Sequence, residues 1–314
     1  MRAILDKLIY NDEYQNIDDN LTDSNVGARK QRNIRDNFFV INAILNSVTK
    51  GNLRSVDVTT YDAEKCFDKL FAKECFNDMS DNGFKNDKLP LLYKENMNAK
   101  VAVKTAKGTT RPITINEVIK QGTVWGSLFC TVTIDKLGKQ VYSMRELIYK
   151  YKGVDLPPLG MVDDIVTVTD VEKTAEMNRL VNTFIEHKNL KLSKDKCYRI
   201  HIGKGDENCP ELKVHGDTMK DADQEKYLGD IIHKNGSIQA TIESRCKKGD
   251  GIIAEILSIL NEVPLGKYKT EVGMKLRDAM LLNGILYNSE AWHGITNAQV
   301  VKLQQIYEAL LRRI

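Results

Sequence analysis

Two adjacent aspartates, Asp163 and Asp164, lie in an otherwise apolar stretch between residues 159 and 168. The pattern predicts two short strands, over 160–162 and 165–169, joined by a tight turn that carries both carboxylates. Aspartate is common in turns, so a solvated hairpin is the simplest interpretation of the pair on its own. However, two like charges among apolar residues raise the cost of ionising each other unless a cation lies between them. A hard divalent ion such as Mg2+ prefers carboxylate oxygens and shares them with substrate phosphates, so the pair indicates a metal–phosphate site if other segments complete it.

A third carboxylate, Asp62, lies where one predicted element gives way to the next. Residues 55–62 alternate and are rich in β-branched side chains, which predicts a strand. Residues 63–71 place their large apolar side chains on one helical face, which predicts a helix. An aspartate at this junction has a structural explanation, because Asp is a preferred N-cap residue. The C-terminal end of a strand is also where α/β folds place their chemistry.

The elements that would position these carboxylates alternate between helices and strands up to about residue 235. Hydrophobic periodicity predicts helices over 2–10, 32–48 and 171–188, a hairpin over 99–115, and strands over 147–151, 198–202 and 227–232. Beyond residue 238 the period changes from 2 to 3.6, which predicts three helices, over 239–261, 268–287 and 298–313. The sequence thus predicts an α/β body followed by a helical C-terminal part.

Charge and cysteine content narrow the class of protein. The 314 residues carry a formal net charge of +3, too small to argue for nucleic acid by itself, although residues 29–35 hold four cations. The six cysteines form no C-x-x-C pair and no sequence cluster with histidine, so neither disulfides nor a zinc site is expected, and His201 is interpreted as solvent-facing or hydrogen-bonded rather than as a ligand. Without a signal peptide or a membrane-spanning segment, we expect a soluble protein of the cytoplasm or nucleus.

In this order and spacing the features resemble the palm of reverse transcriptases, most closely that of LINE-like, non-LTR retrotransposons. The resemblance covers nearly the whole chain. The segments that carry it are residues 25–30 and the Phe38-Phe39 pair before the catalytic strand, 61–68 as the first metal motif, 121–127 as the template and nucleotide loop, 161–164 as the second metal motif, 192–196 as the lysine motif, 227–229 as the primer-grip turn, and 286–292 beyond the palm. The aspartate hairpin alone is a weak signal, whereas the ordered set is specific.

The resemblance implies an α+β fold: a right-hand polymerase palm, with an antiparallel sheet and helices on one face, followed by a helical thumb-like subdomain. It implies partial fingers and a connecting helix over residues 1–52. The palm would cover residues 53–235, and the thumb-like region residues 236–314.

The resemblance also implies the chemistry. The protein would be an RNA-directed DNA polymerase, in which a primer 3′-hydroxyl attacks the α-phosphate of a dNTP while two Mg2+ ions, or Mn2+, stabilise the attacking and leaving oxygens. The metal ligands and catalytic residues would be Asp62, Asp163 and Asp164. The nucleotide-binding residues would be Phe67 beneath the incoming sugar, Gln121, Gly122, and Lys196, which is equally well explained as a solvated loop residue. The contacts to the RNA template and DNA primer would come from Arg29, Lys30, Tyr227, Leu228 and Gly229, with Arg245, Lys247 and Lys248 in the thumb-like region.

One feature of that family is missing. Its fingers carry a basic triphosphate-binding segment with an Arg-Pro-x-Ser-like core, and nothing before Asp23 resembles it, while Arg111-Pro112 lies after the catalytic strand. The chain is therefore interpreted as an N-terminally truncated reverse transcriptase. Two alternatives stay open: a non-catalytic nucleic-acid-binding relic, and a group II intron maturase-like protein. The sequence predicts neither the template nor the oligomeric state.

Overall fold

The computed structural model of the protein describes residues 2–85, 87–96, 99–115, 123–204, 209–264 and 266–314. The chain forms two compact units. The first consists of residues 1–37 and 54–222, and the second of residues 38–53 and 223–314. The functional boundaries that the sequence predicts, at residues 52 and 235, stay predictions. Within the described residues, no helix has the length and apolar character needed to cross a membrane.

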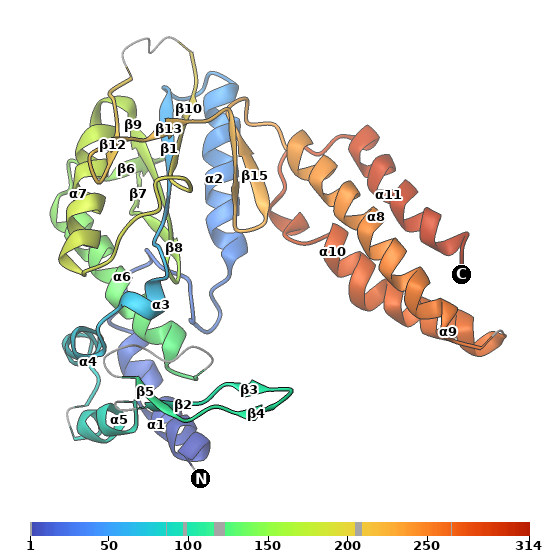
Figure 1. Ribbon diagram of the computed structural model, residues 1–314. Coiled ribbons are helices and arrows are strands. Elements are labelled where there is room, and N and C mark those ends of the chain that lie inside the picture. Colours follow the sequence, from blue (N-terminus) through green and yellow to red (C-terminus); the bar gives the residue numbers. More distant parts are fainter. Residues whose placement is uncertain (1, 86, 97–98, 116–122, 205–208, 265) are drawn as a thin grey trace. The chain divides into compact units, whose positions relative to one another are not determined.

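A five-stranded sheet organises the first unit, with its strands in the order β13–β10–β1–β9–β8 (Figure 1). The central strand β1 (Val56–Asp62) pairs antiparallel with β9 (Asp164–Asp170) on one side and β10 (Tyr198–Ile202) on the other. At the edges, β8 (Leu159–Met161) is antiparallel to β9, and β13 (Lys220–Asp221) is parallel to β10. The predicted α+β class with an antiparallel sheet is confirmed.

Two helices share an apolar core with one face of this sheet. Helix α7 (Thr174–His187) buries residues at the spacing of a single helical face, namely Met177, Val181, Phe184 and Ile185. Helix α6 (Gly126–Ser143) is buried along most of its length. Both pack in one core with Tyr61 and Ile165, which are register partners on β1 and β9. The two helices lie on the same side of the sheet in Figure 1.

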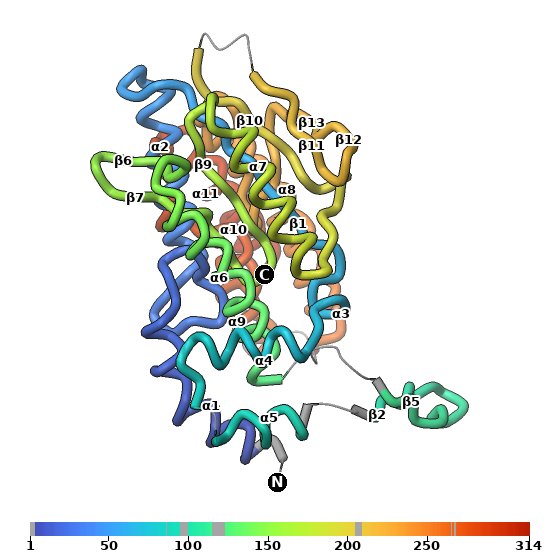
Figure 2. Tube along the Cα trace, turned by 90° about the vertical axis from the view of Figure 1, so that its left-hand side faces the viewer, coloured from blue at the N-terminus to red at the C-terminus, as the bar shows by residue number. Residues whose placement is uncertain are grey.

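The remaining elements of the first unit are helices and short strand pairs. They are α1 (Arg2–Asp18), α3 (Cys66–Lys69), α4 (Ala72–Asp81), α5 (Leu89–Asn96), the 3-10 turn η1 (Val171–Lys173), and the pairs β2–β5 (Ala99–Val101, Ile113–Ile115), β3–β4 (Lys104–Thr105, Gly108–Thr109), β6–β7 (Tyr149–Tyr151, Val154–Leu156) and β11–β12 (Lys213–Val214, Asp217–Thr218). Figure 2 shows α1, α4 and α5 close together at one end of this unit. Helix α1 continues past residue 10, where the sequence pattern ends it, because Tyr14 and Ile17 are buried in the core.

The second unit is mainly helical, as the C-terminal sequence predicts. Its elements are the larger part of α2 (Ile34–Thr49), the hairpin of β14 (Gln224–Tyr227) and β15 (Asp230–His233), α8 (Gln239–Asn261), α9 (Lys267–Leu276), the π-helical segment η2 (Arg277–Leu282), α10 (Asn283–Ile285), the 3-10 turn η3 (Ser289–Ala291) and α11 (Asn297–Leu311). Thr296 and Gln299 form a reciprocal capping box at the start of α11. The helices enclose a separate apolar core that includes Ile256, Leu281 and Leu303.

Candidate active site

Three carboxylates come together where β1 ends. Asp62, the last residue of β1, is the register partner of Asp164, the first residue of β9. Asp163 precedes Asp164 in the turn that joins β8 to β9. Because side chains alternate along a strand, Asp62 and Asp164 project from the face opposite to the Tyr61–Ile165 pair. The structure therefore brings together the three residues that the sequence predicts as metal ligands.

The chain beyond Asp62 differs from the prediction. Helix α3 begins at Cys66, not at residue 63, and the residue before it, Lys65, has a left-handed φ of 50°. Asp62 is therefore not the N-cap, and that structural explanation for the residue is wrong. The backbone carbonyl of Asp62 instead accepts a hydrogen bond from the N–H of Ser193 at 2.9 Å. Its carboxylate remains available to the site.

The turn that presents Asp163 has a strained backbone that Asn25 fixes in place. Val162 has a φ of 63°, a costly conformation for a β-branched residue. Asn25 is 1% exposed. Its Oδ1 accepts hydrogen bonds from the N–H groups of Val162 at 3.1 Å and Gly27 at 2.8 Å, and its Nδ2 donates to the carbonyl of Val162 at 2.9 Å. A Cβ at Gly27 would lie 2.4 Å from the backbone nitrogen of Val162, so this close approach requires glycine.

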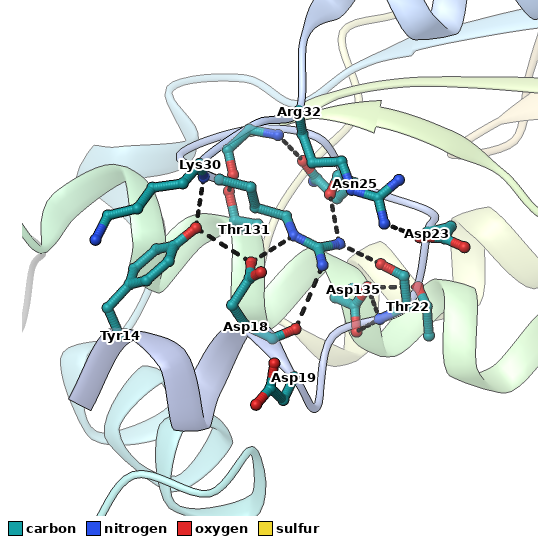
Figure 3. Close-up of polar contacts among 12 residues, drawn as sticks. Tyr14, Asp18, Asp19, Thr22, Asp23, Asn25, Lys30, Arg32, Thr131 and Asp135 are labelled. Atoms are coloured by element: carbon teal, nitrogen blue, oxygen red, sulfur yellow. Dashed lines mark hydrogen bonds and ion pairs between the residues drawn. The ribbon is translucent and has the colours of Figure 1, made fainter. Parts of the chain in front are cut away.

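Contacts with helix α6 hold the segment that contains Asn25 (Figure 3). Thr22 donates to the carboxylate of Asp135 from its N–H at 3.1 Å and from its hydroxyl at 2.5 Å. The hydroxyl of Thr131 donates to the carbonyl of Gly27 at 2.9 Å. Asp135 and Thr131 are fully buried. The aspartate turn is thus braced by the core helix through an N-terminal segment more than a hundred residues away in sequence.

Arg29 belongs to the same internal network, which corrects its predicted role. Its side chain is 4% exposed, and its Nε donates to Asp18 at 2.7 Å while its Nη1 donates to the carbonyl of Thr22. A guanidinium satisfied by its own chain is not available to a nucleic-acid phosphate. Lys30, in contrast, has an exposed side chain, and its contact with template or primer stays a prediction.

The predicted lysine lies beside the carboxylates. The Nζ of Lys196 is 3.4 Å from both oxygens of Asp62, and 67% of the lysine side chain is exposed. The loop that carries it is joined to the end of β1 by a bridge between Ala63 and Leu192 and by a hydrogen bond from the N–H of Glu64 to the carbonyl of Lys191 at 2.8 Å. An exposed ion pair at this distance is weak. The ammonium group of Lys196 can therefore leave Asp62 and bind another anion.

The electrostatics of the three carboxylates favour a cation. Burial raises the pKa of Asp163, and the charge of Asp62 raises it further. Burial, followed by the charges of Asp163 and Asp62, raises the pKa of Asp164 to about 6, against an opposing effect of Lys196. Within the part of the chain that the structure describes, Lys196 is the cation that opposes these shifts, and one amine does not balance three carboxylates. The donor set consists of carboxylate oxygens, which suits a hard ion such as Mg2+ or Mn2+.

Phe67, predicted to lie beneath the incoming sugar, is on α3 and is half-buried. It packs against the core that contains Tyr61 and Cys66. This fixes one side of its ring and leaves part of it exposed, five residues after Asp62. Its contact with a nucleotide stays a prediction. Gln121 and Gly122, the other predicted nucleotide contacts, lie outside the described residues.

The predicted primer-grip residues form the turn of the β14–β15 hairpin in the second unit. Leu228 and Gly229 have φ values of 48° and 103°, as expected of a two-residue hairpin turn with both residues left-handed. Tyr227 is buried, with its ring 5.6 Å from that of Phe38. The structure establishes the turn, and its contact with a primer stays a prediction.

Arg245, predicted to contact the template–primer backbone, is wrong as a phosphate ligand. It is 4% exposed. Its Nη2 donates to the carbonyl of Gly229 at 2.9 Å and to the carboxylate of Asp230 at 2.5 Å, and its guanidinium lies 4.9 Å from the ring centre of Tyr287. It therefore ties helix α8 to the hairpin turn. Its neighbours Lys247 and Lys248 are exposed.

Comparison with known proteins extends these observations. Residues 2–232 match the family described as reverse transcriptase (RNA-dependent DNA polymerase). Among solved structures, the chain is similar to apo telomerase from Candida tropicalis, with a TM-score of 0.54, 12% identity, and coverage of 100% of this chain and 50% of the telomerase chain. A form of that telomerase truncated from its C-terminal domain gives a TM-score of 0.51 and 13% identity, with coverage of 73% and 44%. A comparison with curated proteins finds no match.

The structural likeness concerns the fold, since the identities are low and the chain spans half or less of the telomerase chains. The family match covers well over half of this sequence, and the cluster of carboxylates lies within the matched region. The chain therefore belongs to the reverse transcriptase (RNA-dependent DNA polymerase) family.

Proposed function

We propose that this protein is an RNA-directed DNA polymerase that adds dNTPs to a primer 3′-hydroxyl with the help of two divalent metal ions. The observation that carries the proposal is the meeting of Asp62, Asp163 and Asp164 at the end of β1 in a member of this family. The order of the sequence motifs further supports an origin in LINE-like, non-LTR retrotransposons. The RNA template, DNA primer and dNTPs are part of the same proposal.

The carboxylates fit the metal ions that this chemistry requires. Asp62, Asp163 and Asp164 would hold them. Burial and mutual repulsion raise the pKa of Asp163 and Asp164, and a bound cation would offset that repulsion. When bound, two such ions stabilise the attacking and leaving oxygens of a phosphoryl transfer.

The chain's own residues would position the substrates. Lys196 offers an exposed ammonium beside Asp62, where it would bind an oxygen of the triphosphate. Phe67, fixed on one side by the core, would support the sugar and exclude a 2′-hydroxyl. Lys30, Lys247 and Lys248 are exposed and would contact phosphates without reading sequence, so binding should weaken steeply with salt.

Primer extension on an RNA template with Mg2+ and dNTPs tests this function. We expect the full chain to extend the primer and Asp163→Asn to fail. Asp68→Asn is the matched control, since Asp68 is an exposed aspartate on α3 outside the cluster. Equal extension by Asp163→Asn and the wild type would refute the proposed site. No extension by the wild type, with salt-sensitive binding of template–primer retained, would favour the non-catalytic relic.

A further inference from the structure

A second group of chemistry-bearing side chains lies at the opposite end of β1. Asp57 is near the start of the strand and is the register partner of His201 on β10. Since Asp62 lies five positions after Asp57, an odd number, the two aspartates project from opposite faces of the sheet. Cys209 approaches His201 from the segment beyond β10. Asp57 is fully buried, whereas His201 and Cys209 are half-buried.

The three side chains converge on one point. Nδ1 of His201 lies 2.9 Å from Oδ1 of Asp57 and 3.5 Å from Sγ of Cys209. The ligand atoms of all three residues lie within 4.8 Å of one another. Both neighbours thus approach the same ring nitrogen. This excludes a nucleophile–histidine–carboxylate relay, in which the two partners must occupy different nitrogens of the ring.

The chemistry of the three groups suits one cation. A protonated Nδ1 donates to Asp57, and an unprotonated Nδ1 can accept from the thiol, so the nitrogen makes one strong hydrogen bond at a time. The carboxylate, the imidazole and the thiolate can instead all donate lone pairs to a single bound ion.

The surroundings support a bound ion. The other oxygen of Asp57, Oδ2, accepts a hydrogen bond from the hydroxyl of Thr174 at 2.8 Å, and Thr174 lies 2.8 Å from the hydroxyl of Thr169. Metal-binding carboxylates are oriented by such outer partners. The nearby cation Arg199 is already matched, because its guanidinium contacts both oxygens of Asp221 at 2.7 Å.

The segment that carries Cys209 is also held in place. Nη1 of Arg199 donates to the carbonyl of Pro210 at 2.5 Å, which fixes the residue after Cys209 against β10. The thiol is thus positioned by the fold and not by its contact with His201 alone. A bound ion would connect β1, β10 and this segment.

We propose that Asp57, His201 and Cys209 bind one Zn2+ ion, distinct in place and chemistry from the carboxylate cluster at Asp62. A thiolate and an imidazole select Zn2+ over Mg2+, and the half-exposed His201 and Cys209 leave a fourth position for water. The ion fixes the start of β1 against β10. This proposal differs from the interpretation of the sequence, in which no zinc site is expected and His201 is not a ligand.

Metal titration of the full-length, chelator-treated chain tests the site. We expect one Zn2+ to bind per chain with a dependence on Cys209, and Co2+ in its place to give a thiolate-to-cobalt charge-transfer band. Cys209→Ser and His201→Gln should remove the band, and Thr174→Ala should weaken binding about tenfold. Cys246→Ser is the matched control, because Cys246 is half-buried and outside the cluster.

A variant in the carboxylate cluster tests whether the ion binds there and not at Asp57, His201 and Cys209. Asp163→Asn should leave the charge-transfer band unchanged, whatever it does to primer extension. Absence of the band in the wild type, or its persistence in both Cys209→Ser and His201→Gln, would overturn the proposal. Zinc binding that is lost in Asp163→Asn but retained in Cys209→Ser would do the same, because it would place the ion at Asp62. Circular dichroism of each variant confirms that the fold is kept.

Discussion

The two ends of strand β1 place aspartates in contrasting surroundings. At the start, Asp57 is fully buried and both of its oxygens have partners, on Thr174 and His201. At the end, the side chain of Asp62 is 29% exposed and faces a second aspartate across the sheet, and its one contact with a cation among the described residues is a loose one with Lys196. Asp57 is surrounded by a hydroxyl, an imidazole and a thiol. Asp62 belongs to a cluster of like charges.

This difference contrasts a structural carboxylate, Asp57, with the clustered carboxylates that are proposed to bind metal ions. A buried aspartate with two partners stabilises the native state. Its removal leaves those partners without a hydrogen bond in the core, which lowers the free energy of unfolding. Clustered carboxylates that lack positive charge carry unfavourable free energy in the metal-free protein, which a divalent cation would offset. Substitutions at the two ends of β1 should therefore act on different properties of the molecule.

The largest effect is expected at the end of β1. Asp62→Asn should reduce primer extension by at least about a thousandfold, because one of the three proposed metal ligands is lost, while its thermal unfolding midpoint stays equal to or above that of the wild type. Steady-state extension rates and thermal unfolding of the same preparations measure both. A variant that unfolds early, or that extends within a few-fold of the wild type, would place Asp62 with the structural aspartates.

The brace of the aspartate turn should give the next largest effect. Asn25→Ala removes three hydrogen bonds from a buried site, so we expect a loss of about 1–3 kcal/mol in the free energy of unfolding. Extension should fall about 10- to 100-fold, since a small misplacement of reacting groups is costly.

A shift in metal dependence distinguishes this positioning role from general destabilisation. The Mg2+ concentration for half-maximal extension should rise in Asn25→Ala. It should not change in Asn20→Ala, an exposed asparagine that donates to the carbonyl of Asn16 at 2.7 Å. Equal Mg2+ dependence in Asn25→Ala and the wild type would contradict the role in positioning.

The opposite end of β1 should respond in stability and not in catalysis. Asp57→Asn weakens the contacts with His201 and Thr174, which should lower the free energy of unfolding by about 1–3 kcal/mol. The extension rate per folded molecule should stay within about twofold of the wild type, because the change is distant from the carboxylate cluster along β1. Chemical denaturation and active-site titration measure the two quantities. A specific loss of rate in folded Asp57→Asn would break the contrast between the two ends.

Stability without metal should depend on pH in a direction set by Asp164. Its pKa is raised from 3.8 to about 6 by burial and by Asp163 and Asp62. Between these values the folded chain holds a proton that the unfolded chain has released, so this group makes stability fall as pH rises from about 4 to about 6. The ionised form then costs about 1–2 kcal/mol.

Asp164→Asn removes this cost. In chelator, its thermal unfolding midpoint should exceed that of the wild type at about pH 7.5, and the difference should shrink at about pH 5. Mg2+ should stabilise the wild type more than the variant. A difference that grows on acidification would show that the carboxyl of Asp164 is not held in its neutral form.

The smallest effect is expected for the exposed lysine. Lys196→Ala should raise the KM for dNTP about 3- to 10-fold and change stability by less than about 0.5 kcal/mol, because its pair with Asp62 is exposed. Lys194→Ala is the control, since Lys194 is 65% exposed and pairs with Asp217 at 3.6 Å. Identical KM values for the two variants would leave Lys196 as a solvated loop residue.

Local patterns predicted the parts of the site that depend on neighbouring residues. Alternation along β1 and the turn at Asp163 and Asp164 are short-range properties, and both are found in the structure. The capping box of Thr296 and Gln299 is also a short-range feature, because its two residues lie three positions apart. The sequence does not predict the start of α3, because the left-handed Lys65 interrupts a helical pattern that begins three residues earlier.

Partners that are distant in sequence could not be predicted in this way. The clamp from Asn25 to Val162 and the ion pair between Arg245 and Asp230 depend on how the chain folds back on itself. A cationic side chain looks the same in sequence whether it faces solvent or a buried carboxylate, so the sequence predicts phosphate contacts for both Arg29 and Arg245. The meeting of Asp57, His201 and Cys209 is hidden likewise, because strand pairing brings His201 to Asp57 and the chain beyond β10 brings Cys209 to His201.

Manganese binding measured by electron paramagnetic resonance tests the central claim most directly, because it requires no turnover. In the presence of template–primer and a non-hydrolysable dNTP, the wild type should bind two Mn2+ ions that are magnetically coupled, as expected for a separation of roughly 4 Å. Asp163→Asn should lose the coupled signal, while Asp68→Asn should keep it. Absence of bound Mn2+ in the wild type, or an unchanged coupled signal in Asp163→Asn, would contradict the assignment of these carboxylates as the metal site.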